Sequence, residues 1–200
     1  ILSMWLINPN GVETIPSGST YTIEWDGPAK AVKFKLQYSL NKGKDWKTIK
    51  KGIVGKTYNW QVPKPNKSTN KCLVKVTGYN ASGKKVGVDK SNAPFKIEVI
   101  TITSPNGGET LTSGNPYNIK WDTYGTKKPI FKILLKYTIN GGKKWLTIGT
   151  IKGNNPGTYQ WTVPAVSAAK NKCKVMVQLK DKKGKSIGSD ASDGYFGIEP

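Results

Sequence analysis

Residues 58–63 read Tyr-Asn-Trp-Gln-Val-Pro, and residues 159–164 read Tyr-Gln-Trp-Thr-Val-Pro. In each stretch aromatic residues alternate with polar ones until a proline ends the run. This alternation is typical of a β-strand with one buried face, and a proline cannot continue the hydrogen-bonded ladder of a central strand. The stretch therefore predicts a β-rich fold that occurs twice in the chain.

Further blocks repeat at a similar distance along the chain. The matched pairs are residues 9–13 with 105–109, residues 17–26 with 113–122, and residues 38–46 with 137–145. Two copies in 200 residues give modules of about 100 residues, which is a common domain size. We predict two domains, residues 1–98 and residues 99–200.

Alternation with a period of two continues through most of each copy, for example from Tyr21 to Trp25, and no helical stripe of apolar residues interrupts it. Turn signals such as Asn41-Lys42-Gly43 separate seven alternating segments in each copy. Seven short strands per copy predict an all-β fold of two tandem immunoglobulin-like β-sandwich domains. Residues 95–102 contain no Gly or Pro, so we expect the domains to join end to end without a flexible linker, as an elongated rod.

Taken together, these motifs resemble a known group of repeats. Pro-Asn-Gly-Gly-Glu at 105–109, Trp121, the Asn-Gly-Gly turn at 140–142 and the Trp161 strand are similar to immunoglobulin-like repeats of secreted and cell-surface bacterial and archaeal proteins. A more distant similarity is to the N-terminal domain of a yeast cell-wall protein family. The resemblance implies an extracellular or cell-surface location and a spacer, adhesion or accessory role without a shared active site.

The charge of the chain is strongly positive. All 32 basic residues are lysines, against 12 carboxylates, which gives a formal net charge of +20. The absence of His and Arg removes the commonest general base and the usual forked phosphate clamp. We predict no enzymatic activity, no cofactor and no metal site. The repeated acids Glu13/Glu109, Asp26/Asp122 and Asp89/Asp190 are interpreted as turn caps or ion-pair partners, in preference to glycosidase carboxylates or a calcium site.

Strand parity places many lysines on one face of each predicted sandwich. Val32, Phe34, Leu36 and Tyr38 are expected to point inward, so that Lys33 and Lys35 point outward. The same reasoning applies to the strand at 71–77, to the final strand, and to the second copy. The predicted polyanion-binding residues are Lys33, Lys35, Lys71, Lys75, Lys85, Lys96, Lys132, Lys136, Lys172, Lys174, Lys180 and Lys185.

Like charges on paired strands repel, and an anionic polymer would relieve that repulsion. Lysine is a point charge suited to phosphate backbones, whereas base recognition favours Arg. We therefore expect a non-specific partner such as extracellular DNA or an acidic polysaccharide, with the chain as a repeating coat or filament subunit along it. The alternatives are a Lys-biased surface with no partner, a spacer or adhesion module, and a carbohydrate-binding accessory domain.

The N-terminal segment and the two cysteines also carry information. The N-terminal residues Ile1, Leu2, Met4, Trp5 and Leu6 are more apolar than their counterparts in the second copy. They are interpreted as the first strand, with self-association through this segment as the alternative; Trp5 is the best candidate for an exposed aromatic residue. Cys72 and Cys173 occupy equivalent positions and are expected to be buried thiols. No apolar stretch is long enough to span a membrane.

Overall fold

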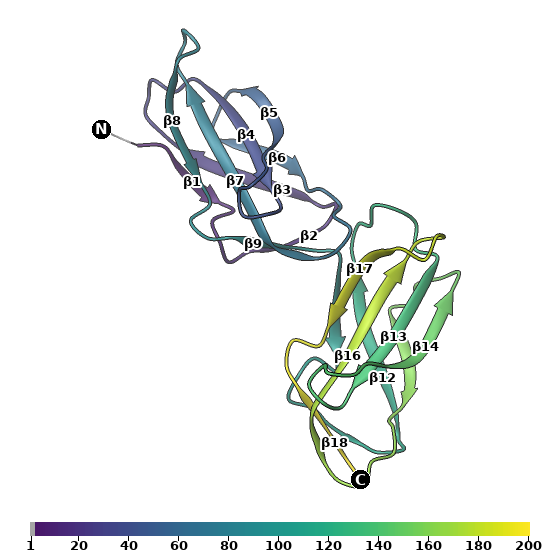
Figure 1. Cartoon of the computed structure of the whole chain (residues 1–200). Coiled ribbons are helices and arrows are strands. Elements are labelled where there is room, and N and C mark those ends of the chain that lie inside the picture. Colours follow the sequence, from purple (N-terminus) through teal and green to yellow (C-terminus); the bar gives the residue numbers. More distant parts are fainter. Residues whose placement is uncertain (1–2) are drawn as a thin grey trace. The chain divides into compact units, whose positions relative to one another are not determined.

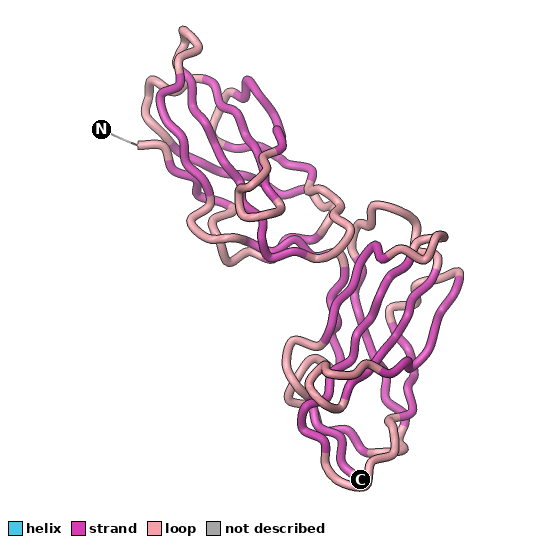
Figure 2. Tube along the Cα trace, in the orientation of Figure 1, coloured by secondary structure: helices cyan, strands magenta, loops and turns pink. Residues whose placement is uncertain are grey.

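The computed structural model describes residues 3–200, and every regular element in them is a β-strand (Figures 1 and 2). Unit 1 holds the described residues up to Pro63 together with Thr69–Glu98, and unit 2 holds Lys64–Ser68 together with Val99–Pro200. In each unit a three-stranded sheet accompanies a six-stranded sheet, below called the smaller and the larger sheet. The predicted all-β fold with two immunoglobulin-like sandwiches is confirmed.

In unit 1 the smaller sheet has the order β1-β3-β6, and the larger sheet has the order β2-β9-β7-β4-β5, with β8 paired to β7. The smaller sheet contains β1 (Trp5–Asn8), β3 (Thr20–Asp26) and β6 (Thr57–Gln61). The larger sheet contains β2 (Thr14–Pro16), β4 (Lys33–Ser39), β5 (Lys47–Ile53), β7 (Thr69–Tyr79), β8 (Lys85–Lys90) and β9 (Phe95–Glu98).

Unit 2 repeats this topology strand for strand, with orders β10-β12-β15 and β11-β18-β16-β13-β14, and with β17 paired to β16. Its smaller sheet contains β10 (Ile100–Ser104), β12 (Pro116–Thr123) and β15 (Thr158–Thr162). Its larger sheet contains β11 (Thr110–Thr112), β13 (Lys132–Thr138), β14 (Leu146–Lys152), β16 (Lys170–Lys180), β17 (Ser186–Ala191) and β18 (Phe196–Glu199).

Each unit has nine strands where the sequence predicted seven, because the first and last strands are each divided in two. In unit 1 the two breaks meet at Ser91. Its hydroxyl donates to the Pro9 carbonyl at 2.8 Å and accepts the Val74 N–H at 3.0 Å. Ser192 makes the same two contacts in unit 2. A side chain thus satisfies the backbone groups that a continuous strand would have paired.

The two cores are built from the inward positions of both sheets, as the alternation predicted. Trp25 and Trp60 are almost fully buried in unit 1, and Trp121 and Trp161 are buried in unit 2. Val32 is an exception: its side chain is 42% exposed because it precedes the strand that begins at Lys33, so its predicted inward position is wrong.

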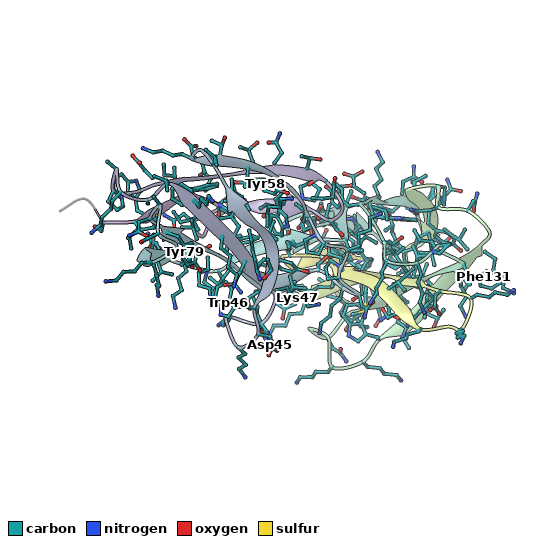
Figure 3. All side chains as sticks on the ribbon, turned by 90° about the horizontal axis from the view of Figure 1, so that it is seen from above. Asp45, Trp46, Lys47, Tyr58, Tyr79 and Phe131 are labelled. Carbon is teal, nitrogen blue, oxygen red and sulfur yellow. The ribbon has the colours of Figure 1, made fainter. Side chains whose placement is uncertain are left out.

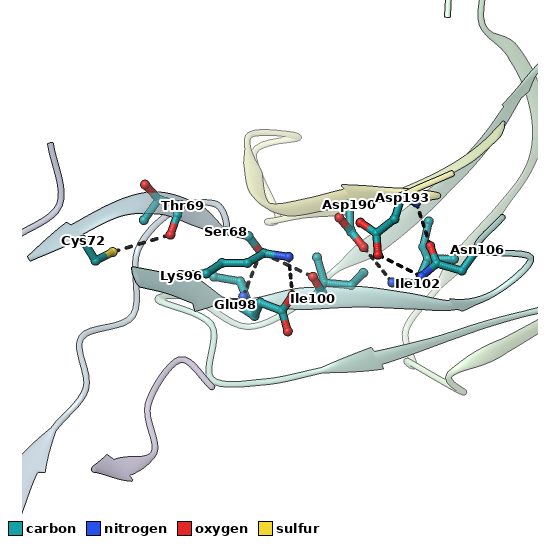
Figure 4. A network of polar contacts seen from close by, with 11 residues as sticks. Ser68, Thr69, Cys72, Lys96, Glu98, Ile100, Ile102, Asn106, Asp190 and Asp193 are labelled. Atoms are coloured by element: carbon teal, nitrogen blue, oxygen red, sulfur yellow. Dashed lines mark hydrogen bonds and ion pairs between the residues drawn. The ribbon is translucent and has the colours of Figure 1, made fainter. Parts of the chain in front are cut away.

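Cys72 and Cys173 are free and fully buried, which confirms the predicted state of these thiols. Cys72 lies on β7, with its Sγ 3.5 Å from the Thr69 carbonyl oxygen (Figure 4). Burial raises the pKa of the Cys72 thiol to about 12 and raises that of Cys173 as well. Both thiols are therefore neutral packing groups at physiological pH.

The repeated glutamates Glu13 and Glu109 have the same structural role in the two units. Glu13 accepts the backbone N–H groups of Asn10, Gly11 and Val12, at 2.7, 2.8 and 3.0 Å. Burial raises the pKa of Glu13, but these hydrogen bonds outweigh it and leave the pKa below its usual value; the pKa of Glu109 is lowered in the same way. The predicted turn-capping role is therefore confirmed for both glutamates.

The aspartate pairs divide into two roles. Asp89 accepts the Leu6 N–H at 2.7 Å and Asp190 accepts the Ile102 N–H at 2.7 Å (Figure 4), so each links a strand of the larger sheet to the first strand of the smaller sheet. Asp26 forms an ion pair with Lys56, as predicted. Its counterpart Asp122 is exposed, and Gly157 stands at the position equivalent to Lys56.

Candidate functional site

The lysines of unit 1 are divided unequally between its two sheets. The strands of the smaller sheet contain no lysine. Those of the larger sheet contain ten: two in β4, three in β5, two in β7, two in β8 and one in β9. The positive charge on the strands of unit 1 is therefore confined to one sheet.

Strand pairing gathers several of these lysines on the outer surface of the larger sheet. Strand β7 lies between β4 and β8, and Lys75 of β7 is opposite Gln37 of β4 and Lys90 of β8. Two residues further along each strand, on the same surface, Lys35 of β4 is opposite Thr77 of β7. We call this surface the lysine face; it is defined by Lys33, Lys35, Lys75, Lys85 and Lys90.

Lys75 is at the centre of the lysine face. Partial burial lowers its pKa, and the positive charges of Lys35, Lys85 and Lys90 lower it further. Its Nζ is 4.0 Å from the ring centroid of Trp46, a cation–π contact. The three neighbouring ammonium groups disfavour the charge on Lys75, and a bound anion would favour it.

Trp46 adds an aromatic surface to the lysine face. It lies in the turn before β5 and is half-buried, and Figure 3 labels it together with its chain neighbours Asp45 and Lys47. Gly43, whose φ of 84° suits glycine, leaves space beside the indole: a Cβ there would be 3.3 Å from the Trp46 ring and 3.6 Å from Leu73. The indole thus covers Leu73 and extends toward Lys75.

Two predicted residues of unit 1 lie apart from this cluster. Lys71 is exposed on the first part of β7, where the strand pairs with β9. Lys96 lies on β9 and forms an ion pair with Glu98, whose carboxylate is nearly buried (Figure 4). Lys96 is therefore engaged within its own strand, and its role in polyanion binding stays a prediction.

The same rows of unit 2 carry different side chains. Where unit 1 has Gln37, Lys75 and Lys90 opposite one another, unit 2 has Lys136, Met176 and Ala191. Strand register likewise matches Lys35 to Leu134 and Lys85 to Ser186. Unit 2 therefore lacks the four-lysine cluster, although its backbone topology is the same.

The predicted lysines of unit 2 fall into three groups. Lys174 donates from Nζ to the carbonyl oxygens of Ser192 at 2.8 Å and Asp193 at 3.0 Å, so its ammonium closes a turn. The binding role of Lys174 stays a prediction. Lys132 and Lys180 are opposite each other at one end of the sheet, with Lys152 on the other side of Lys132. Lys136, Lys172 and Lys185 remain separate from this row.

Two residues of the site were missed by the sequence reading. Lys90 was overlooked because the final strand was taken as one segment, whereas β8 ends at Lys90 and a new strand begins at Phe95. Trp46 was assigned to the core with the other aromatic residues. Its position directly after the Asn41–Asp45 turn, before the next alternating segment, was the available signal.

The N-terminal segment is the first strand of unit 1, as favoured from the sequence. Strand β1 pairs with β3, and Met4 and Leu6 are buried in the core. Met4 and Leu6 are buried within unit 1 and pack in its core, so the assembly role predicted for them stays a prediction. Trp5 is 37% exposed on the outer surface, and self-association through it remains a prediction; Ile1 and Leu2 lie outside the described residues.

Residues 3–200 show neither a metal site nor a membrane-spanning helix. No group of three or more His, Cys, Asp or Glu side chains is placed to hold a metal ion in that part of the chain. Nor does the described part contain a helix that could cross a membrane.

Comparisons with known proteins give structural likenesses only. No protein-family model matches the chain, and no curated protein does. The fibronectin(III)-like modules of Clostridium thermocellum CbhA are 15% identical over 98% of this chain and 93% of that chain, with a TM-score of 0.35. The FN1-FN3 domains of chicken CNTN1 are 13% identical over 97% of this chain and 65% of that chain, with a TM-score of 0.33.

The sheet topology itself identifies tandem immunoglobulin-like or fibronectin-III-like sandwiches. Many cell-surface domains share this architecture. Such modules are typically non-enzymatic, and their function depends on sites carried by the sheet faces and loops.

Proposed function

We propose that the chain is a non-enzymatic extracellular or cell-surface binding protein whose lysine face in unit 1 binds an anionic polymer without sequence specificity. The observation that carries the proposal is the cluster of Lys35, Lys85 and Lys90 around Lys75. Few acids balance this cluster: the described ion pairs of unit 1 involve Lys56 and Lys96, which are outside it.

The energetics of the cluster favour an anionic ligand. Four ammonium groups on paired strands repel one another. Partial burial lowers the pKa of Lys75, and this repulsion lowers it further. A phosphate, sulfate or carboxylate group bound between them would raise that pKa again. Repulsion within the free protein is thus relieved on binding, and the relief adds to the affinity.

The chemistry of lysine limits what the site can recognise. Ammonium groups neutralise phosphates but lack the forked donors with which Arg reads guanine. Duplex DNA outside the cell is the partner that best matches a flat, lysine-rich sheet surface, and an acidic polysaccharide offers the same electrostatics. In either case affinity should depend steeply on salt.

A matched pair of variants tests the proposal. The first, Lys35→Leu/Lys75→Met/Lys90→Ala, gives the lysine face the residues of unit 2. The second, Lys64→Met/Lys67→Ala/Lys120→Leu, removes three exposed lysines outside the face, so both variants lose the same charge. Binding of each to duplex DNA and to heparin is measured across a salt series.

We expect the first variant to bind at least about tenfold more weakly at low salt, with the slope of log K against log salt reduced in magnitude by about 3. The second variant should retain most of the affinity. Equal losses in the two variants would show that binding follows net charge alone and would overturn the proposed site. The absence of DNA and heparin binding by the wild-type protein at low salt would overturn the proposed function.

A further inference from the structure

Each unit also contains a groove at the open side of its sandwich, between the edge strand of the larger sheet and the edge strand of the smaller sheet. In unit 1 it lies between β5 and β6 and has a volume of about 210 Å³. In unit 2 it lies between β14 and β15 and has a volume of about 380 Å³. The unit 2 volume is within the range for ligand pockets, ~300–1,000 Å³, and the unit 1 volume is below it.

The two grooves have almost the same lining. In unit 1 the lining residues are Tyr38, Thr48, Ile49, Tyr58, Trp60 and Gln61. In unit 2 the matching residues are Tyr137, Thr147, Ile148, Tyr159, Trp161 and Thr162. None of them is charged, although the chain carries 32 lysines. The grooves are therefore alike in the two units, whereas the neighbouring sheet faces differ.

Tryptophan forms the deepest part of each groove. Trp60 is 3% exposed and Trp161 is 5% exposed, and they pack against Tyr38 and Tyr137 with ring centroids 5.5 and 5.2 Å apart. The two indoles therefore form the floor of the grooves, and the half-buried tyrosines present the more accessible aromatic surface.

Tyrosines supply phenol groups to both grooves. Tyr58 and Tyr159 line the grooves of unit 1 and unit 2, and both side chains are half-buried. In unit 2 the Tyr159 hydroxyl passes close to β14 at Gly149, where a Cβ would be 2.3 Å from the Tyr159 oxygen. The absence of a side chain at Gly149 thus allows this ring to lie across the strand.

We propose that these two grooves bind neutral sugar residues of a polysaccharide. The half-buried tyrosine rings offer a face to the C–H surface of a sugar ring, and their phenol groups form hydrogen bonds with its hydroxyls. An uncharged lining in a strongly basic chain favours a neutral ligand over an anionic one. Because the groove occurs once in each unit, a polymer with a repeated sugar supplies a ligand for both.

The test uses tyrosine-to-phenylalanine variants, which keep the packing and remove only the hydroxyl. Binding of cellohexaose, maltohexaose and the chitin hexamer to the whole chain is measured by calorimetry and by tryptophan fluorescence. The variant Tyr58→Phe/Tyr159→Phe is compared with Tyr79→Phe/Tyr195→Phe, whose tyrosines lie outside both grooves. Thermal melting confirms that all variants are folded.

We expect at least one of the three hexamers to bind, with affinity reduced about tenfold or more in the groove variant and unchanged in the control. Gly149→Ala should weaken only the site in unit 2, because the new Cβ displaces Tyr159. If none of the hexamers binds, or if the groove and control variants bind alike, the proposal is overturned. Duplex DNA binding should be unchanged in the groove variant, which separates this result from a failure of the lysine face.

Discussion

The larger sheets of the two units have the same strand order but different outer surfaces. In unit 1 the central row is Gln37, Lys75 and Lys90, and in unit 2 it is Lys136, Met176 and Ala191. Both larger sheets carry lysines, but in unit 2 Lys174 is bonded to backbone carbonyls and Lys136 is the one lysine of the central row. The proposed function therefore predicts that binding depends on the register of lysines across strands and not on their number alone.

The largest expected effect is obtained by transferring the unit 1 pattern to unit 2. The variant Leu134→Lys/Met176→Lys/Ala191→Lys recreates the central rows of the lysine face on a sheet of the same topology. We expect its affinity for duplex DNA at low salt to rise at least about tenfold, with a salt slope steeper by about 3. The measurement is a DNA titration across a salt series.

The control for this graft adds the same charge to the smaller sheet of unit 2. The variant Thr103→Lys/Asn118→Lys/Thr158→Lys replaces three exposed residues there. It should gain less affinity than the graft on the larger sheet. Equal gains would mean that the two faces of unit 2 are equivalent and that register is irrelevant.

A feature that the units share should respond alike in both. Replacing Glu13 or Glu109 by Gln places an amide donor against backbone N–H groups in the same turn of each unit. We expect each change to cost about 1–3 kcal/mol in the free energy of unfolding, with the larger loss for Glu13, which accepts three backbone hydrogen bonds where Glu109 accepts two. Chemical denaturation of the single variants measures both values.

The pH dependence of these glutamates follows from their lowered pKa values. A carboxyl group with a lower pKa in the folded state contributes stability at pH above about 4.5, and loses it as the pH falls through the folded-state pKa. As the pH falls from about 5 to about 2, the wild-type protein should therefore lose more stability than either Gln variant. Parallel losses would contradict the capping role.

The smallest effect concerns the repulsion around Lys75. Because the pKa of Lys75 is lowered in the folded state, its charged ammonium destabilises the folded protein at neutral pH. This destabilisation is relieved only as the pH rises through the folded-state pKa toward 10.5. Raising the salt from about 0.01 to about 0.15 M shortens the screening length from ~30 to ~8 Å. The added salt should stabilise the wild-type protein, by less than about 1 kcal/mol.

The matched variant Lys75→Met should show a smaller gain from salt, because it has the residue that unit 2 carries at this position. Lys64→Met, which removes an exposed lysine outside the face, serves as the comparison and should respond like the wild-type protein. A gain for Lys75→Met as large as that of the wild type would show that the lysines of the face do not repel one another appreciably.

Sequence alone predicted the fold well because alternation is local. The inward positions of Phe34, Leu36 and Cys72 follow directly from strand parity, and so do the outward positions of Lys35 and Lys75. Strand parity alone did not predict the ion pair of Lys96. Glu98 lies on the same side of the strand, but its burial depends on packing. The contacts of Lys174 depend on a turn near Ser192 that is far away in sequence.

The grooves were beyond the reach of sequence reasoning for a related reason. Tyr58 and Trp60 were correctly placed on the inward side of a strand, which is compatible with either a closed core or an open edge. Whether a groove forms is decided by the pairing order, which leaves β5 and β6 at the edges of their sheets. Edge positions are set by the whole fold and carry no local signal.

The most direct test is a lysine footprint with duplex DNA. Limited acetylation of the wild-type protein, analysed by mass spectrometry with and without DNA at low salt, reports the accessibility of each ammonium group. The account predicts that Lys35, Lys75, Lys85 and Lys90 become protected first and most strongly, while Lys132, Lys136 and Lys180 are little affected. Equal protection of the lysines in both units, or stronger protection in unit 2, would contradict it.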